Sequence, residues 1–503
     1  MRRTAGLCAL LTAAAVGAAW TIGDAAVPER AAASATISSA VSNAAATGAA
    51  TGAAANAVSN AARSAPLSAA PGSARLTPVV AKKKKKKLRK RDVMVIGANW
   101  GGTASIVDAR TYRTLRTLNI VPDKAQEMQE IWTNPLRLAL YLVIQQVIGQ
   151  GHDQLVDDLF TTRDGNLVAV SRPSFGDVVW IDMATNRIVA EQQMEGFRTD
   201  HMEVSPDGTR LLVSDSTAKK VHEYVLGGRG NPDTGKKLRT FPSGETPHES
   251  NFIAGGKRIV HASIGRVYTP LDAGELGELG NVIKADRWLQ IVRNSDFKIL
   301  QRWDIGKELA EAGYPQMSSA VRPMAISPDE RYLYLQVSFF HGVVVFDTQA
   351  KDLNNTVDYT LGGVPEPRTG RVLRLVHLPI KESVKTMPRE EYVLDSAHHG
   401  MAINKAGTKL CVAGTMSDYG AIVRIGNLTS GAWKQKIFNA GLKPYWATTS
   451  PYSNTCWMSM SGTDQVVVYN YKREKVVAKV KTGDHPQRVR EGHVSARVQR
   501  AWR

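Results

Sequence analysis

Cysteine is scarce in this sequence, and the short motifs that mark several large enzyme classes are missing. The 503 residues include three cysteines, Cys8, Cys411 and Cys456, so cysteine usage alone says little about function. The sequence contains no G-x-S-x-G elbow, no Walker loop and no H-E-x-x-H pair, which excludes nucleophile-elbow hydrolases, P-loop nucleotidases and zincin proteases. Any chemistry must therefore come from side chains that distant segments bring together.

Acidic residues are also few relative to basic ones, but only at the two ends of the chain. Lysine and arginine number 64 against 46 acidic residues, a formal charge of +18. Residues 1–91 account for +12 of it and residues 486–503 for +4, whereas residues 92–485 carry 45 basic and 43 acidic residues. A near-neutral body argues against nucleic acid as a partner. With 43% hydrophobic residues the body can bury a large core, so whole-chain disorder is excluded.

The apolar run at the N-terminus is shorter than the roughly 20 residues that a membrane-spanning helix needs. This run, Leu7–Trp20, follows Arg2-Arg3 and precedes several small residues. The arrangement predicts a secretory signal peptide over residues 1–26, with an uncleaved membrane anchor as the alternative. The protein is therefore expected outside the cytoplasm, either secreted or associated with the cell surface.

Two further N-terminal segments have too biased a composition to pack into a core. Residues 27–81 are rich in Ala and Ser and predict a disordered linker. Residues 82–91 (Lys82–Arg91) contain nine lysines or arginines, which repel one another and stay solvated. We expect this polybasic run either to attach the protein to an anionic cell-wall polymer or lipid headgroups, or to serve only as a charged spacer.

The body repeats one pattern of short strands and turns. Each copy has β-branched strands of four to six residues bounded by Gly, Pro, Asn or Asp, and two copies share a Ser-Pro-Asp turn. Four-stranded units about 40–50 residues apart are typical of β-propeller blades. The six interior copies begin near Leu159, His201, His248, Pro323, Gly400 and Trp446.

The two ends of the body complete a seventh blade. Val93–Leu118 supplies three strands that lack an inner strand, and Pro486–Arg490 begins like an inner strand and then stops. Together they predict an all-β, seven-bladed β-propeller over residues 92–495 that is closed by the C-terminal strand, which removes exposed sheet edges. A basic tail, 496–503, follows. Residues 122–149 depart from the repeat and predict a short helical insertion between blades 1 and 2, forming a cap on one face.

Several motifs of the body match a known family pattern. They are Val204-Ser-Pro-Asp-Gly208, Ile326-Ser-Pro-Asp329, Val178-Val-Trp-Ile-Asp182 and Gly483-Asp-His-Pro-Gln-Arg488. On these motifs the body resembles the secreted bacterial YVTN-type seven-bladed propellers, although the Tyr-Val-Thr-Asn strand itself is replaced by variants such as Leu212-Val-Ser-Asp215. The resemblance implies a propeller fold and an extracytoplasmic location. It implies no particular chemistry, since propellers serve many functions.

One polar position precedes the innermost strand of every predicted blade, where side chains point toward the mouth of the central channel. Aligning the copies on the Ser-Pro-Asp turn places seven residues at or next to this position: Asp158, His201, His248, Arg322, His399, Tyr445 and His485. Imidazoles from different blades are suited to bind a transition metal. We therefore predict His201, His248 and His399 as candidate metal ligands and the other four as candidate ligand-binding residues.

These observations leave three functional hypotheses open. The first is a binding or interaction module, expected to be a monomer, that takes a small-molecule or protein ligand at the channel mouth. The second is a metal-dependent oxidoreductase or lyase that uses one copper, zinc or iron ion on the histidine ring. The third is binding of a polyanion or of the cell wall through the basic leader.

The two cysteines of the body occupy the second strands of neighbouring blades, one residue out of phase. Because adjacent blades diverge outward, we expect Cys411 and Cys456 to be two buried thiols. A disulfide between them, in an oxidising compartment, is the alternative.

Overall fold

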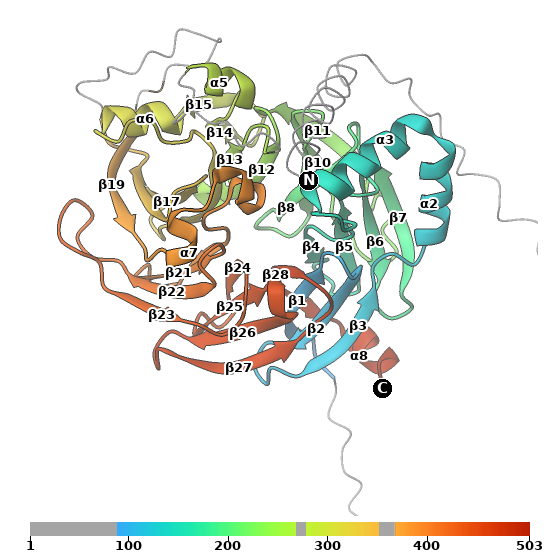
Figure 1. The fold of residues 1–503 in the computed structure, drawn as a ribbon. Helices are drawn as coiled ribbons and strands as arrows, with labels where there is room; N and C mark the ends of the chain where they lie inside the picture. The colour runs from blue at the N-terminus through green and yellow to red at the C-terminus, as the bar shows by residue number, and fades with distance from the viewer. Residues whose placement is uncertain (1–87, 268–277, 352–366, 368) are drawn as a thin grey trace, which may run out of the picture. The chain divides into compact units, whose positions relative to one another are not determined.

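The computed structural model describes residues 88–267, 278–351, 367 and 369–503. The predicted signal peptide, linker and the run of six lysines in residues 82–87 lie outside these ranges. Within them, seven four-stranded antiparallel sheets are arranged around a common axis (Figure 1). We call the region between the inner strands, where their inward side chains meet, the channel. The all-β, seven-bladed propeller predicted from the sequence is thus confirmed. Among the described residues, no helix is both long enough and apolar enough to cross a membrane.

In each blade the four strands follow one another from an innermost strand at the axis to an outermost strand at the rim, and the blades contain the following strands in that order. Blade 1 contains β28 (Pro486–Val494), β1 (Arg91–Ala98), β2 (Thr103–Asp108) and β3 (Thr114–Asn119). Blade 2 contains β4 (Leu159–Thr161), β5 (Leu167–Arg172), β6 (Asp177–Asp182) and β7 (Arg187–Gln193). Blade 3 contains β8 (Thr199–Val204), β9 (Arg210–Asp215), β10 (Lys220–Val225) and β11 (Lys237–Pro242). Blade 4 contains β12 (Pro247–Ile253), β13 (Arg258–Ser263), β14 (Leu289–Arg293) and β15 (Ile299–Trp303).

The remaining blades follow the same order. Blade 5 contains β16 (Val321–Ile326), β17 (Tyr332–Val337), β18 (Gly342–Asp347) and β19 (Arg371–His377). Blade 6 contains β20 (Met401–Ile403), β21 (Lys409–Gly414), β22 (Tyr419–Arg424) and β23 (Gln435–Phe438). Blade 7 contains β24 (Pro444–Thr449), β25 (Thr455–Met460), β26 (Gln465–Asn470) and β27 (Lys475–Lys481).

The burial of the strands explains their sequences. Middle strands such as β6 are buried along their whole length, because a neighbouring blade covers each face, and they are correspondingly rich in valine and isoleucine. The outermost strand of the same blade, β7, alternates between exposed and half-buried residues. The predicted Ser-Pro-Asp-Gly turn is also present, with the Ser205 hydroxyl 2.6 Å from the Asp207 carboxylate and Gly208 at a φ of +68°, a conformation that favours glycine.

The C-terminal strand closes the ring as predicted. Strand β28 pairs with β1 from Arg91↔Val494 to Ile96↔Val489, so a strand from the end of the chain becomes the inner strand of the first blade. Arg91, the last residue of the polybasic run, begins β1. The predicted tail forms a short helix, α8 (Ala496–Ala501), whose first turn is capped by the Ser495 hydroxyl.

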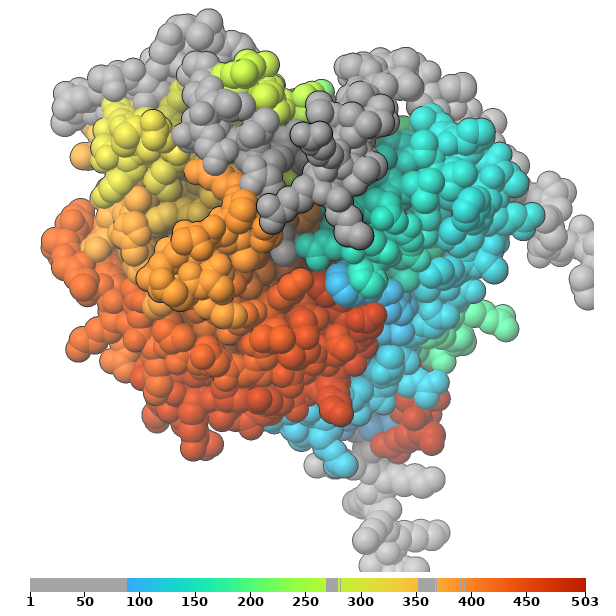
Figure 2. Space-filling view, in the orientation of Figure 1, coloured from blue at the N-terminus to red at the C-terminus, as the bar shows by residue number. Residues whose placement is uncertain are grey.

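One face of the ring carries the additional helices, and we call it the upper face because the inner strands begin there. The predicted insertion 122–149 consists of α2 (Lys124–Thr133), α3 (Pro135–Val143) and the π-helical turn η1 (Ile144–Ile148). Helices α2 and α3 lie beside β6 and β7 of blade 2 in Figure 1, and this part of the chain forms the teal surface in Figure 2. Other helices are α5 (Glu278–Lys284), α6 (Ile305–Glu311) and α7 (Glu382–Lys385). Single 3-10 turns are η2 (Ala254–Gly256), η3 (Arg389–Glu391), η4 (Val393–Asp395) and η5 (Ser461–Thr463).

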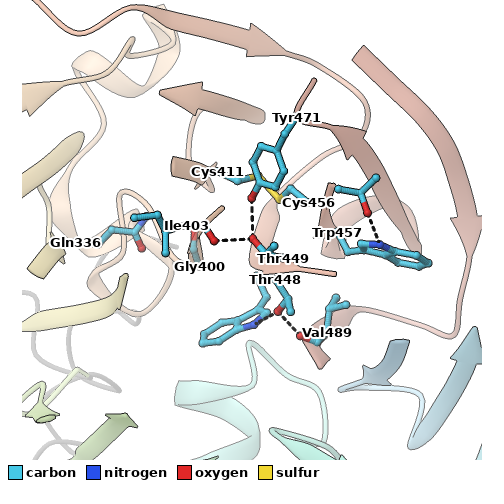
Figure 3. The surroundings of a disulfide bond; sticks show 12 residues. Gln336, Gly400, Ile403, Cys411, Thr448, Thr449, Cys456, Trp457, Tyr471 and Val489 are labelled. Carbon is cyan, nitrogen blue, oxygen red and sulfur yellow. Dashed lines mark hydrogen bonds between the residues drawn. A yellow bond between two sulfur atoms is a disulfide. The ribbon is translucent and has the colours of Figure 1, made fainter. Parts of the chain in front are cut away.

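The two cysteines of the body form a disulfide, so the prediction of two buried thiols was wrong. Cys411 of β21 and Cys456 of β25 are joined with their Cα atoms 6.5 Å apart (Figure 3), a separation within the normal range for disulfides. Both are completely buried among apolar side chains between blades 6 and 7. Blades do diverge outward, but second strands lie close enough to the axis for neighbouring Cα atoms to remain within reach.

Candidate functional site

A β-bulge near the start of the inner strands decides which side chains enter the channel. In blade 3, Thr199 pairs with Asp215 and Met202 with Val213, so three steps on β8 match two on β9. The same irregularity occurs in β12, β16, β24 and β28. A bulge re-aims side chains that would otherwise alternate between faces. Two consecutive residues of one strand, Tyr445 and Trp446, both contact the ring of His399 as a result.

Each blade therefore presents two adjacent residues to the channel, in two layers that we number from the upper face. The first layer consists of Asp157, Asp200, His248, Arg322, His399, Tyr445 and Gln487. The second layer consists of Asp158, His201, Glu249, Pro323, Gly400, Trp446 and Arg488. Of the seven residues predicted from the sequence, four belong to the first layer and two to the second.

Three of the predicted residues, His201, His248 and His399, come together at the centre of the channel. One ring nitrogen from each lies within 4.8 Å of the others. The imidazole centroids of His201 and His248 are 3.8 Å apart, and His399 lies 6.3 Å from the first and 5.7 Å from the second. The three side chains are only 1–3% exposed. We call these three residues the histidine cluster.

Burial and neighbouring arginines keep the histidine cluster uncharged. Desolvation lowers the pKa of His201 and His399 well below the ordinary value, and Arg488 lowers it further. The pKa of His248 is lowered by burial and then by Arg322. All three imidazoles are therefore neutral near pH 7, and a neutral imidazole has the free lone pair that a metal ligand requires.

Two of the three rings are held in place by further contacts. His399 stacks on the Tyr445 ring with a centroid distance of 4.0 Å, and its Nδ1 lies 3.3 Å from the Tyr445 carbonyl oxygen. Donation from Nδ1 to this carbonyl leaves the Nε2 lone pair of His399 available, as in many metal-bound histidines. His201 contacts the edge of the Trp446 ring at 5.4 Å. Within the residues that the structure describes, the buried Nδ1 atoms of His201 and His248 have no hydrogen-bond partner.

A second group of potential ligands shares His201 but is already neutralised. Asp157 and Asp200 offer carboxylate oxygens within 4.8 Å of a ring nitrogen of His201. Asp157 pairs with Arg488, and Asp200 pairs with Arg198 at 2.5 Å. Burial raises the pKa of Asp157 above its ordinary range, against the opposing influence of Arg488. The histidine cluster is therefore the better set of free ligands.

Arg488 of β28 is the central cation of the site. Its Nη2 lies 3.2 Å from each carboxylate oxygen of Asp157 and also contacts Nε2 of His201. The guanidinium stacks over Trp446 at 4.4 Å from the ring centroid. The side chain is 1% exposed, and its Nε and Nη1 atoms have no hydrogen-bond partner in the described part of the chain.

A second arginine of β28, Arg490, follows Arg488 by two residues toward the lower face. It donates to both oxygens of Asp158 at 2.9 and 2.6 Å, so the predicted ligand-binding residue Asp158 is engaged in an ion pair. On its other side, Arg490 lines a cavity of about 380 Å³ together with Glu203.

The other predicted residues differ in their relation to the cluster. Arg322 of β16 lies in the first layer, donates to the Ser338 hydroxyl at 3.0 Å and to the Leu394 carbonyl, and lowers the pKa of His248.

His485, by contrast, does not lie at the histidine cluster. Its ring stacks on Trp100 at 3.7 Å, and the ring of His152 stacks on Trp100 at the same distance, so His485 belongs to a separate stack of three rings.

Sequence reasoning missed Asp157, Asp200, Trp446 and Arg488. A usable signal was present, because Pro247, Pro444 and Pro486 each stand at the start of an inner strand. When the blades are aligned on this proline, Arg488 of β28 falls at the same position as Trp446 of β24. When they are aligned on the Ser-Pro-Asp turn at the other end of the inner strand, the bulge lies between the turn and the site, so residues of the two layers are placed at one position.

Comparisons with known proteins identify the fold and no family. No protein-family profile matches the sequence, and no curated protein sequence matches it. Among solved structures, a functionally unknown protein from Desulfotomaculum acetoxidans is 11% identical, with a TM-score of 0.50, over 80% of this chain and 99% of that one. A candidate 6-phosphogluconolactonase from Bacteroides fragilis is 9% identical (TM-score 0.49; 81% and 99% covered). Hydrazine synthase from Kuenenia stuttgartiensis is 14% identical (TM-score 0.44; 76% and 90% covered).

At these identities the likeness concerns the fold alone. The chain is a seven-bladed β-propeller.

Proposed function

We propose that this propeller is a binding module whose channel holds one transition-metal ion on His201, His248 and His399. The observation that carries the proposal is the convergence of three buried ring nitrogens from three different blades within 4.8 Å. Bringing imidazoles out of water into one small space is costly unless their polar atoms gain a partner. A metal ion supplies that partner to all three at once.

The ligand set favours copper, zinc or iron. Neutral imidazole suits these borderline metals, whereas magnesium and calcium prefer oxygen ligands. Three protein ligands also leave at least one coordination position open, which is the usual arrangement where a metal binds a further ligand or substrate. An open position is also the feature that favours the second candidate function, a metal-dependent oxidoreductase or lyase.

Metal analysis tests the proposal. We expect tag-free protein, reconstituted separately with copper, zinc and iron(II), to retain close to one equivalent of at least one of them after gel filtration. His248→Gln and His399→Gln should each lower the affinity in isothermal titration calorimetry by about 100-fold. His261→Gln is the matched control, because His261 is equally buried but hydrogen-bonds to the hydroxyls of Ser243 and Ser250. Retention of no metal by the wild type, or unchanged affinity in the double variant His248→Gln/His399→Gln, would contradict the proposal.

We also propose an extracytoplasmic location, with the polybasic run as an attachment to anionic cell-wall polymer or lipid headgroups. The disulfide between Cys411 and Cys456 supports an oxidising compartment. Gln499 of α8 donates to the Arg89 carbonyl oxygen at 2.7 Å, so the end of the polybasic run lies beside a C-terminal helix that carries Arg497 and Arg500. Residues 89–91 and α8 therefore lie side by side, which brings basic residues of both ends of the described chain together.

Sedimentation tests the attachment. We expect the chain lacking residues 1–26 to co-sediment at low salt with purified cell walls or phosphatidylglycerol vesicles, and deletion of residues 82–87 to abolish this. Replacing those six lysines by serines is the control for linker length and should also abolish it. Binding that survives both changes would remove the basis of the proposal, since it depends on counter-charge attraction.

A further inference from the structure

Arg488 has donors that no described residue uses. A guanidinium presents five N–H groups, and here one nitrogen, Nη2, makes the contacts to Asp157 and His201. The Nε and Nη1 atoms belong to a side chain that is 1% exposed, and they have no hydrogen-bond partner among residues 88–267, 278–351, 367 and 369–503. Buried donors without partners are rare in proteins and call for a physical explanation. Arg490, two residues along the same strand, has no such deficit at its Nε, which donates to Asp158 at 2.9 Å.

Arginine side chains lie against the histidine cluster. Arg488 contacts Nε2 of His201, and the positive charges of Arg322 and Arg488 act on His248 and His399. A divalent ion on the histidine cluster would add two positive charges to this buried place. Buried charge is unfavourable without a counter-ion, so a metal ion here would favour an anion beside it.

We infer that the channel holds a small oxyanion, a carboxylate or an inorganic oxyanion, against the free N–H groups of Arg488 and at the open position of the metal. The inference rests on the proposed metal site and names the class of ligand that this site takes. Arginine is the residue best matched to oxyanions, because its N–H groups donate charge-assisted hydrogen bonds in a fixed geometry. Burial of every residue in the cluster restricts the ligand to a small ion.

The surroundings hold Arg488 in position for this task. Trp446 lies under its guanidinium at 4.4 Å and Tyr445 lies at 5.8 Å, while Asp157 fixes one side of the group through Nη2. A guanidinium that is already ordered loses little conformational freedom when the anion binds. Arg488 is thus a specificity-determining residue for an anionic ligand, and the adjacent metal supplies the other half of the anion's charge compensation.

Calorimetric titration with sodium formate, and separately with potassium phosphate, tests the inference on zinc-loaded and on metal-free protein. We expect one saturable site on the zinc-loaded wild type for at least one of the two anions. Arg488→Gln should weaken anion binding by about ten-fold or more, the effect of losing a charge-assisted hydrogen bond. Arg490→Gln is the control, because it removes a largely buried arginine of the same strand whose charge is already paired with Asp158, and it should bind the anion like the wild type.

The outcomes separate this inference from the proposed metal site. If zinc binds but neither anion gives a saturable signal, or if Arg488→Gln and Arg490→Gln bind equally, the inference is overturned and the metal site stands. If no metal binds, the metal site fails; anion binding by the metal-free protein that is lost in Arg488→Gln then still supports the anion site, and its absence overturns both. Where Arg488→Gln does not fold, judged by circular dichroism, Arg488→Lys keeps the charge and should show a smaller loss of the same binding.

Discussion

The Nη2 atom of Arg488 lies 3.2 Å from both carboxylate oxygens of Asp157, although 331 residues separate the two in the sequence. The pair joins the last inner strand of the chain to the start of the second blade. Closure of the ring therefore also completes the candidate site, because β28, the strand that completes blade 1, carries Arg488.

Replacing Asp157 by Asn should leave that cation uncompensated. Breaking a buried ion pair by removing one partner typically costs about 3 kcal/mol of unfolding free energy, and the unpaired Arg488 should also repel a metal ion at His201. We expect a lower urea midpoint, weaker zinc binding and stronger formate binding by calorimetry. Asp296→Asn, in an exposed pair with Arg293, should change none of the three. Equal zinc affinity in Asp157→Asn and wild type would contradict the electrostatic account.

His261 should make stability fall in acid. Burial lowers its pKa from 6.5 to about 3, so between these values the unfolded chain binds a proton that the folded chain does not. Stability from this group is therefore complete above about pH 6.5 and is lost as the pH falls, by about 2 kcal/mol at pH 5. The measurement is the urea unfolding free energy of wild type and His261→Gln at pH 7 and pH 5. The variant should lose about 2 kcal/mol less over this interval; parallel losses would show that His261 is not the group responsible.

The sequence was sufficient to predict the blades, because their signals are local. Short β-branched strands, Ser-Pro-Asp turns and the orphan inner strand at Pro486 each lie within a few residues, and they determine blade number and closure without knowledge of distant contacts. The helical insertion was predictable for the same reason. Residues 122–149 lack the short strands and turns of the repeat, and this difference is visible in the sequence itself.

The candidate site was predictable only in part, because it depends on a backbone irregularity. One extra residue in five of the inner strands, among them β8 and β24, turns two neighbouring side chains inward, and strand alternation alone predicts that one of them points away. The sequence alignment therefore found His248 and His399 in one layer and His201 in the next, and it missed Arg488. The disulfide depends on the distance between neighbouring blades, which no sequence pattern encodes.

The disulfide should contribute substantially to stability. Cys411 and Cys456 are 45 residues apart in the sequence, and restricting the unfolded chain over a loop of that length is worth about 4 kcal/mol on the chain-entropy account. Cys411→Ala/Cys456→Ala should therefore unfold at a clearly lower urea concentration than the wild type, while keeping the same circular dichroism spectrum. Wild type unfolded in dithiothreitol is the control and should match the variant. Identical midpoints with and without the disulfide would contradict this.

Removing the closing strand should abolish both the fold and the candidate site. A chain ending at residue 485 lacks β28, so blade 1 loses its inner strand and exposes the edge of β1, and Arg488 is lost with it. We expect no cooperative thermal transition and no metal or formate binding. A chain ending at Ser495 is the matched control: it loses α8, with the Trp502 bond to the Met183 carbonyl, but keeps β28 and should still fold and bind. Adding a peptide of residues 486–503 to the shorter chain should restore the transition. A chain ending at residue 485 that melts like the wild type would show that closure by β28 does not hold the ring together.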